Sequence, residues 1–301
     1  MRPTSSLKNL AGIAGETVMG DLASPESLRS ALTGCDAVCH VAADYRLWIP
    51  DPAAMYRANV DGTRELLRLA RETGVRRFVY TSSVATMPFR PDGRIVNEDM
   101  PVTIDDMVGH YKRSKFLAEL EAIQAAQAGQ DVIILNPTTP IGSHDTKPTP
   151  TGRIFVEFLR RKFPAYVDTG LNLVDVAEIA RIQVVALTRG QSGRRYILGG
   201  ENLTLKAILD RLSALTGLPS PPVKIPFAVA AAYAWLEETI NGRIRGREPR
   251  ATLDEIKMGR KKMYASSARA EAELGFRVGP IEPALQAAID WFRAEGYAPA
   301  A

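Results

Sequence analysis

Ala37-Val38-Cys39-His40-Val41-Ala42-Ala43 is an apolar run that is typical of a β-strand buried on both faces. Before it, Ser24-Pro25-Glu26 has the residues of a helix start, and Gly34 ends that helix. Strands that alternate with helices through short joints predict βαβ units and a parallel sheet. The elements predicted around the run are helices over 25–32, 55–73 and 105–128 and buried strands over 77–83 and 132–135.

The pattern changes after residue 137. Residues 138–153 form a stretch rich in Pro, Thr and Gly, and the remainder is mainly helical. Predicted here are helices over 154–161, 203–215 (capped by Thr204) and 283–294 and short strands over 173–176 and 195–198. We therefore predict an α/β fold with a Rossmann-like domain over 1–137 and a smaller substrate-binding lobe over 138–301. Strands near 173–200 are expected to return to the first sheet.

The composition is that of an ordinary globular protein. The chain has 301 residues, of which 46% are hydrophobic and 24% charged, with a net charge of +4. This mild charge demands no nucleic-acid partner and would suit an anionic substrate. Residues 1–6 lack the apolar core of a signal peptide. The apolar segment 227–236 is too short to span a bilayer and is expected to be a buried or interface helix.

The two cysteines, Cys35 and Cys39, have no metal-ligand spacing, and no metal site is predicted. Both lie in an apolar stretch, where a cysteine usually behaves as a small buried hydrophobe. We expect two core thiols in a reducing compartment, and hence a cytoplasmic protein.

Tyr111-Lys112-Arg113-Ser114-Lys115 carries the chemistry. The four-residue spacing places Tyr111 and Lys115 on one helical face. A neighbouring ammonium favours the phenolate, so we expect the pKa of Tyr111 to fall below its usual value of about 10. Such a tyrosine can exchange a proton with a carbinol while hydride moves to or from a nicotinamide. The alternative is a surface tyrosine on a basic, solvated helix.

Three predicted strand ends support the first interpretation. Parallel sheets bind ligands at the carboxyl ends of their strands. Those ends carry Ala42-Ala43, Ser82-Ser83 and Asn136-Pro137, and the helix with Tyr111 begins near the same edge.

Together these segments resemble the extended short-chain dehydrogenase/reductase superfamily, also called the NAD-dependent epimerase/dehydratase family. The resemblance is carried by Gly20-Asp21-Leu22, His40–Ala43, Asn59–Thr63, Thr81–Ser83, Tyr111–Lys115, Asn136-Pro137, Leu173–Val176 and Ala272–Phe276. Residues 42–48, 148–153 and 166–172 are most similar to bacterial hopanoid-associated sugar epimerases, and the likeness to dihydroflavonol reductases is looser.

The resemblance implies an enzyme with NAD or NADP as cofactor and a Ser-Tyr-Lys centre. The catalytic residues would be Ser83, Tyr111 and Lys115. Cofactor contacts would come from Arg2, Asp21, Leu22, Ala42, Ala43, Asn59 and Pro137, together with Tyr111 and Lys115. Substrate contacts would come from Tyr45, Ser83, Asn136, Thr151 and Arg153. Asp21 could instead only make a turn, and Asn59 could be purely structural. Arg2 could pair with a 2′-phosphate and favour NADP.

One departure from the family is large. Its first strand, glycine-rich turn and helix are absent, and Gly12, Gly15 and Gly20 have the wrong spacing to replace them. By resemblance, Met1-Arg2-Pro3 corresponds to the end of the second strand. We favour a truncated or misassigned start. The alternative is a genuine loss of cofactor binding.

Three functions stay open. The first is an NAD(P)-dependent epimerase or oxidoreductase of a sugar nucleotide or hopanoid-linked sugar. The second is a reductase of a hydrophobic ketone, like dihydroflavonol or steroid dehydrogenases, which predicts an apolar pocket without cations. The third is a non-catalytic Rossmann-like binding protein. A homodimer through the two long helices and a membrane contact at the 227–236 helix and its basic neighbours are further expectations.

Overall fold

The computed structural model describes residues 7–299. Its larger sheet has four parallel strands in the order β1-β2-β3-β6. They are β1 (Ala37–His40), β2 (Arg77–Thr81), β3 (Val132–Pro137) and β6 (Arg195–Leu198). The register places Val38 beside Phe78, and Phe78 beside Val132. The predicted parallel sheet is confirmed, and 195–198 returns to it as expected. The strand predicted over 173–176 was expected to return as well, but it pairs with two short strands in a separate sheet.

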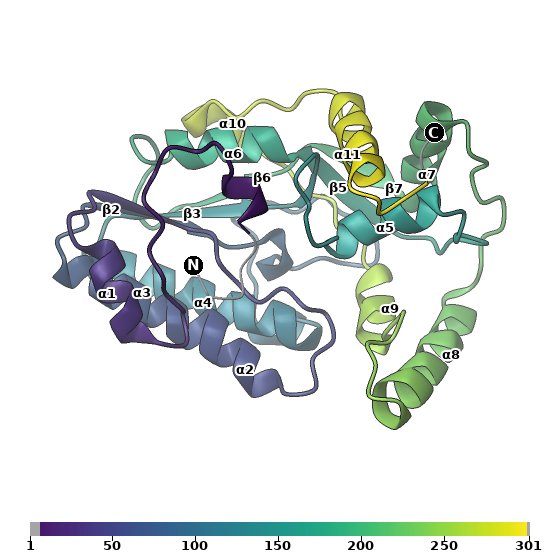
Figure 1. Ribbon diagram of the computed structural model, residues 1–301, viewed down its shortest axis with the longest axis horizontal. Helices are drawn as coiled ribbons and strands as arrows, with labels where there is room; N and C mark the ends of the chain where they lie inside the picture. The colour runs from purple at the N-terminus through teal and green to yellow at the C-terminus, as the bar shows by residue number, and fades with distance from the viewer. Residues whose placement is uncertain (1–6, 300–301) are drawn as a thin grey trace.

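Helices cover both faces of this sheet (Figure 1). One face carries α1 (Pro25–Leu32), α3 (Gly62–Glu72) and α4 (Gly109–Gln127), and the other carries α6 (Val176–Val185) and α10 (Ala268–Leu274). Successive side chains of each strand point to opposite faces of the sheet. Phe78 and Ile134 pack on the α3–α4 side, whereas Val79 and Ile133 pack on the α6–α10 side. The middle strands β2 and β3 are therefore buried on both faces, as predicted.

β1 differs from that prediction. Its Cys39 is exposed, Val41 just beyond it is 59% exposed, and Cys35 before it is exposed as well. The reason is that β1 forms the edge of the sheet, with no strand of residues 7–299 beyond it. The expectation that both cysteines are core residues is therefore wrong.

Two predicted helices are interrupted. Residues 55–73 comprise α2 (Pro52–Tyr56), the π-helical segment η2 (Arg57–Asp61) and α3. Residues 105–128 comprise the 3-10 turn η4 (Ile104–Asp106) and α4. Gly109 has a φ of +79°, a conformation open to glycine at little cost, and this separates η4 from α4.

A smaller sheet organises the second half of the chain. Its strands are β4 (Thr139–Ile141), β5 (Gly170–Asp175) and β7 (Glu201–Thr204), in the order β4-β5-β7. α5 (Pro150–Leu159), α7 (Leu205–Thr216) and α11 (Glu282–Ala294) pack into one apolar core with it. β4 and β7 were not predicted, since three or four residues give little periodicity. Thr204 caps α7 as predicted, accepting a hydrogen bond from the Ala207 amide at 3.1 Å.

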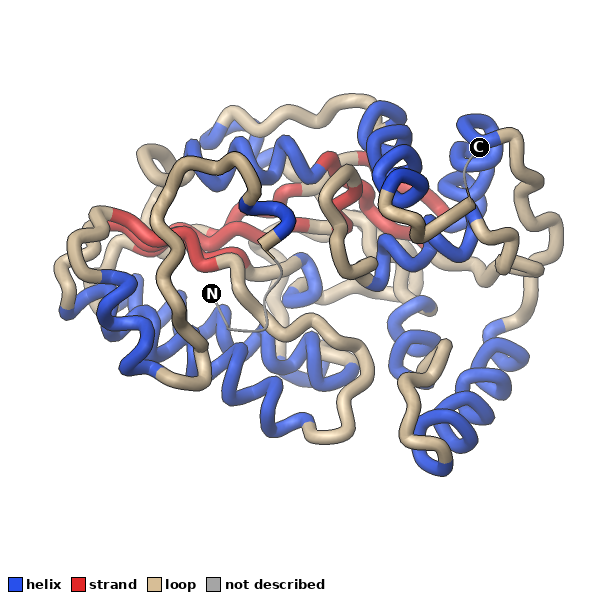
Figure 2. Tube along the Cα trace, viewed as in Figure 1, coloured by secondary structure: helices blue, strands red, loops and turns tan. Residues whose placement is uncertain are grey.

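The remaining elements lie outside these layers. α8 (Phe227–Glu237), the π-helical η5 (Glu238–Ile244) and α9 (Leu253–Gly259) project from the body of the molecule (Figures 1 and 2). Short 3-10 turns are η1 (Lys8–Leu10) and η3 (Val84–Thr86). No helix within residues 7–299 is long and apolar enough to cross a membrane.

Candidate active site

Tyr111 and Ser83 meet at the carboxyl end of β2. Tyr111 lies in the first turn of α4, and Ser83 follows β2 as the N-cap of η3. The Ser83 Oγ accepts a hydrogen bond from the Ala85 amide at 3.1 Å, and the Ser83 side chain is hydrogen-bonded to Tyr111. A hydroxyl has one proton and two acceptor positions, so the Ala85 bond leaves the Ser83 proton available for donation.

Lys115 lies one turn further along α4 and is only 3% exposed. Its Nζ donates to the Thr81 carbonyl at 2.9 Å and to the Tyr80 hydroxyl at 3.0 Å. The same atom lies 4.7 Å from the centre of the Tyr80 ring. The carboxyl end of β2 therefore holds the Lys115 ammonium in place, one helical turn from Tyr111.

Burial controls the protonation of this pair. It lowers the pKa of Lys115 to about 8, opposed by the nearby Glu119 carboxylate. Burial also raises the pKa of Tyr111, opposed by the hydrogen bond with Ser83. The expectation that Lys115 lowers the pKa of Tyr111 is therefore wrong in direction. The physical reason is that desolvation dominates the pKa of this phenol, and the Ser83 hydrogen bond opposes it only in part. At neutral pH the phenol keeps its proton.

Glu119 is the principal site residue that sequence reasoning missed. It is 2% exposed and lies one further turn along α4. Its carboxylate accepts hydrogen bonds from Ser82 Oγ (2.5 Å), Asn136 Nδ2 (2.6 Å), Thr86 Oγ1 (3.0 Å) and Arg195 Nη1 (3.5 Å). The spacing offered a signal, because residues 111, 115 and 119 share one helical face. This carboxylate ties β2, η3, β3 and β6 together beneath the tyrosine.

Asn136 belongs to the same buried network. It is fully buried, and besides Glu119 its Nδ2 donates to the Ser83 carbonyl at 3.2 Å. The structure therefore places Asn136 behind Ser83, where it positions the serine. The predicted substrate contact at Asn136 is corrected accordingly: a side chain at 0% exposure presents no surface to a substrate.

Asn59 likewise holds the site from behind. Its Oδ1 accepts from the Asp44 amide at 2.7 Å. Its Nδ2 donates to the Asp44 carbonyl at 2.8 Å and to Ser114 Oγ at 2.9 Å. The side chain is 2% exposed and lies in the π-helical η2. Of the two roles left open for Asn59, the structure favours the structural one, with the loop after β1 fixed to α4.

The predicted cofactor contacts divide into two groups. After the end of β1, Ala42 is exposed and Ala43 is half-buried. Asp21 instead makes a turn, its Oδ1 accepting from the Ala23 amide at 3.0 Å. Leu22 packs on Gly62, where an added Cβ would lie 2.8 Å from the leucine Cβ.

Pro137 ends β3 as a buried residue, and Arg2 lies outside the described residues. The residues present suit the nicotinamide-ribose end of a dinucleotide, because a phenol and an ammonium lie one turn apart on α4 and a serine hydroxyl is bonded to the phenol. No glycine-rich turn between a strand and a helix precedes β1 within residues 7–36. These residues therefore fit one half of the cofactor.

The structure brings together two of the predicted substrate residues, Tyr45 and Arg153. Burial raises the pKa of Tyr45, the charge of Asp145 raises it further, and the charge of Arg153 lowers it. The loop after β1 and the first turns of α5 therefore lie within electrostatic range. Thr151 occupies the first turn of α5, whose N-cap Thr149 accepts from the Gly152 amide at 3.1 Å.

The cations of these loops are already paired. Arg153 Nη1 lies 2.9 Å from a Glu248 oxygen, and Arg46 Nη2 lies 2.5 Å from an Asp44 oxygen. A free arginine would suit a diphosphate, whereas these pairs leave little net positive charge near Tyr45.

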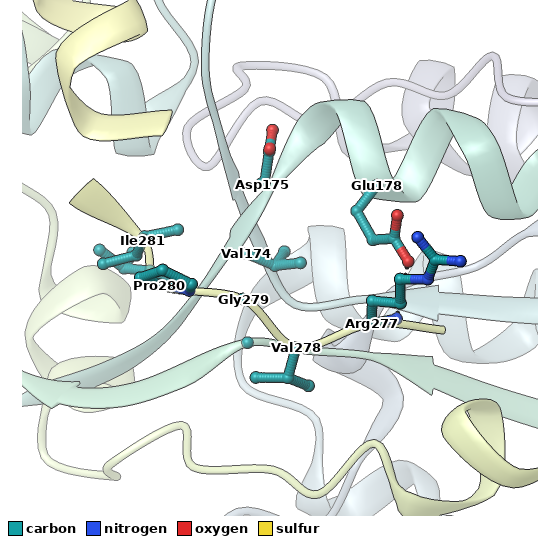
Figure 3. Close-up of a pocket in the computed structure, with 10 residues that line it drawn as sticks. Val174, Asp175, Glu178, Arg277, Val278, Gly279, Pro280 and Ile281 are labelled. Carbon is teal, nitrogen blue, oxygen red and sulfur yellow. Dashed lines mark hydrogen bonds between the residues drawn. The ribbon is translucent and has the colours of Figure 1, made fainter. Parts of the chain in front are cut away.

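A pocket of about 210 Å³ lies away from this centre (Figure 3). Asp175 and Glu178 line it from the start of α6, and Arg277 to Ile281 close it from the loop before α11. Its Glu178 accepts from the Arg277 amide at 2.7 Å and from Arg181. None of the predicted site residues lines this pocket, and it does not enter the chemistry.

Comparison with known proteins identifies the family. The model of the NAD-dependent epimerase/dehydratase family matches residues 2–199. A protein from Synechocystis sp. named "Putative dihydroflavonol 4-reductase" is 44% identical, over 99% of this chain and 87% of its own length. Sterol demethylase protein B from Methylococcus capsulatus is 32% identical, over 98% of this chain and 90% of its own length.

A solved structure agrees with this assignment. The crystal structure of gox2253 superposes with a TM-score of 0.87 at 42% identity, covering 99% of this chain and 90% of that one. This chain belongs to the NAD-dependent epimerase/dehydratase family. It therefore has a Rossmann-like fold, and it is an enzyme of a family whose cofactor is a nicotinamide dinucleotide. The resemblance seen in the sequence is confirmed at the level of the family.

Proposed function

We propose that this member of the NAD-dependent epimerase/dehydratase family reduces a ketone to an alcohol, with Tyr111 as the proton donor. The observation that carries the proposal is the protonation of the pair: burial raises the pKa of Tyr111 and lowers that of Lys115 to about 8. A phenol that keeps its proton at neutral pH suits donation to a carbonyl oxygen.

The chain's own residues supply the proton and the orientation. A bound reduced nicotinamide supplies the hydride that such a reduction needs. Tyr111 donates its hydroxyl proton to the oxygen that becomes the alcohol, while the Ser83 hydroxyl donates a hydrogen bond to the same oxygen. The resulting tyrosinate is stabilised by the adjacent Lys115 ammonium and regains a proton from solvent.

An uncharged, largely apolar ketone is the substrate class we favour. Arg46 and Arg153 beside Tyr45 are each neutralised by a carboxylate, so the loops offer little attraction to a diphosphate. The names of two relatives, a dihydroflavonol reductase and a sterol demethylase protein, refer to fused-ring compounds without phosphate. Of the three functions left open by the sequence, we therefore favour the second, the reduction of a hydrophobic ketone.

Epimerisation of a sugar nucleotide or hopanoid-linked sugar is the second candidate. It is supported by a nucleoside-diphosphate-sugar epimerase from Pseudomonas aeruginosa, whose structure is 27% identical, with a TM-score of 0.79 over 99% of this chain and 89% of that one. The same tyrosine would first remove a carbinol proton and later return it.

An absorbance assay separates these candidates. The protein is incubated with reduced nicotinamide nucleotide and, in turn, a dihydroflavonol, a 3-oxosteroid and a UDP-sugar. We expect one nucleotide to be consumed per ketone reduced. Conversion of the UDP-sugar without net change in nucleotide absorbance would instead establish the epimerase. Failure to bind the nucleotide by calorimetry, even with an added strand and glycine-rich turn before residue 1, would leave the non-catalytic binding protein.

The localisation and the oligomeric state of the protein are also proposals. We propose a cytoplasmic protein that acts on a small molecule and forms a homodimer through α3 and α4. Arg64 already bridges these two helices within one chain, through Glu121 on α4 at 2.7 Å. Analytical ultracentrifugation tests the dimer.

A further inference from the structure

α8 and η5 show the reverse of the usual burial pattern. The side that packs on the protein carries small residues, with Ala230, Ala234 and Gly242 buried. The large apolar residues point outward: Val229 (55% exposed), Tyr233 (48%), Trp235 (56%), Leu236 (48%), Ile240 (41%) and Ile244 (74%). Most of these recur at spacings of three and four, which places them along one side of the helix. We call this set the α8–η5 apolar face.

The acidic and the basic residues next to this face differ in their exposure and their partners. The acids turn inward: Glu237 accepts from the Arg250 amide at 3.1 Å, and Glu238 accepts from the Leu253 amide at 2.7 Å. The arginines at the end of η5 remain exposed and form no ion pair within residues 7–299: Arg243, Arg245 and Arg247. An exposed apolar stripe thus ends in a cluster of uncompensated positive charge.

The place of α8 and η5 in the molecule is a third observation. α8 and α9 project from the body of the molecule (Figure 1), and the apolar side chains of α8 and η5 are 41–74% exposed there. η5 also packs against the candidate substrate loop, because a Cβ added to Gly242 would lie 3.6 Å from the Trp48 ring. The Arg153–Glu248 pair joins the loop after η5 to α5.

We propose that the α8–η5 apolar face docks on the surface of an anionic lipid bilayer. Tryptophan, tyrosine and aliphatic side chains would enter the headgroup boundary, and the three arginines would meet anionic headgroups. A second copy of this chain fits less well. In a two-fold dimer the same patch meets itself, so each arginine cluster would face either the other cluster or the apolar start of α8 in the other copy. Neither offers an acidic partner, because residues 227–236 contain no Asp or Glu. Access of a lipid-soluble ketone from the bilayer to the Trp48 loop also follows, and that extension rests on the proposed function.

Vesicle sedimentation tests the docking without any substrate. The whole protein is mixed with phosphatidylcholine vesicles, with and without about 30 mol% phosphatidylglycerol. We expect binding to the anionic vesicles. Each arginine among Arg243, Arg245 and Arg247 that is replaced by Gln should weaken it by about fivefold. The double variant Ile240→Ser/Ile244→Ser should weaken it by at least about tenfold. The matched control, Val184→Ser on α6, should change it by less than about twofold, although Val184 is 66% exposed.

Two results would overturn the proposal. One is equal vesicle binding by the wild type, the α8–η5 variants and the Val184 control. The other is no vesicle binding together with a dimer that Ile240→Ser/Ile244→Ser dissociates in ultracentrifugation, which would assign the face to a second copy. Because no ketone is present in either measurement, failure of the proposed reduction would leave this test unaffected.

Discussion

α4 and α8 depart from the usual burial rule in opposite ways. α4 buries four polar residues, Lys112, Ser114, Lys115 and Glu119, at the centre of the molecule. α8 buries two alanines and exposes its large apolar residues. Burying a charge destabilises the folded protein, and an apolar side chain left exposed contributes no stabilisation. Stability alone therefore explains neither pattern. The two departures coincide with the two roles that we propose: proton transfer at α4 and docking on a bilayer at α8.

The largest expected effect is on α4. Tyr111→Phe removes the proton donor, and we expect a loss of at least about 100-fold in turnover, the lower range for general acid–base catalysis. The matched control is Tyr233→Phe on α8, which removes an exposed hydroxyl 3.3 Å from Glu237. Steady-state rates with the reduced nucleotide measure both. Near-normal turnover of Tyr111→Phe would remove this tyrosine from the mechanism.

Glu119→Gln tests the buried network beneath the tyrosine. Ser82, Thr86 and Asn136 all donate to one carboxylate oxygen, Oε2, which the amide oxygen can replace. The amide NH2 then faces the Arg195 guanidinium in place of Oε1, and the negative charge beside this partly buried cation is lost. We expect the free energy of unfolding to fall by about 3 to 5 kcal/mol. Glu121→Gln on α4 breaks only the pair with the half-exposed Arg64 and should cost less than about 1 kcal/mol. Similar losses in urea denaturation for the two variants would contradict the role given to Glu119.

Lys112→Met should stabilise the protein. Lys112 is 6% exposed, its Nζ lies 4.0 Å from the Met263 sulfur, and burial followed by repulsion from Lys261 lowers its pKa from 10.5 to about 8. The lowered pKa corresponds to a gain of up to about 3 kcal/mol on removing the charge.

The gain has a defined pH window. Below pH 8 the lysine is charged in both states and its burial penalty is fully present. The penalty disappears between pH 8 and 10.5, because there only the unfolded chain holds the proton. Urea denaturation at pH 7 and pH 10 should therefore show the variant's advantage shrinking. An advantage that is constant with pH would mean that packing, and not charge, is responsible.

The smallest effect is expected on α8. Ile244→Ser should change the free energy of unfolding by less than about 0.5 kcal/mol, because Ile244 is 74% exposed. Ile289→Ser on α11, where the side chain is fully buried, should cost more than about 3 kcal/mol. A large loss for Ile244→Ser would show that the α8–η5 apolar face is covered within the molecule and is not a docking surface.

Sequence determined the family and most of the architecture. The apolar runs at 77–83 and 132–135 fixed β2 and β3, because strands buried on both faces leave a continuous apolar signature. The spacing of Tyr111 and Lys115 placed both on one side of α4, since helical periodicity is a local property. Thr204 and the glycine after residue 73 marked helix boundaries for the same reason.

Tertiary structure decided what depends on distant neighbours. An apolar run does not reveal whether a strand lies inside a sheet or at its edge, so Cys39 in the edge strand β1 and Cys35 before it proved exposed. The direction of the Tyr111 pKa shift depends on how deeply the phenol is buried, which no spacing expresses. Glu119 gains its partners from β2, η3, β3 and β6, four segments that only folding brings together. The apolar sequence of α8 suits either a buried or an interface helix, and only the packed molecule shows that its alanines face inward.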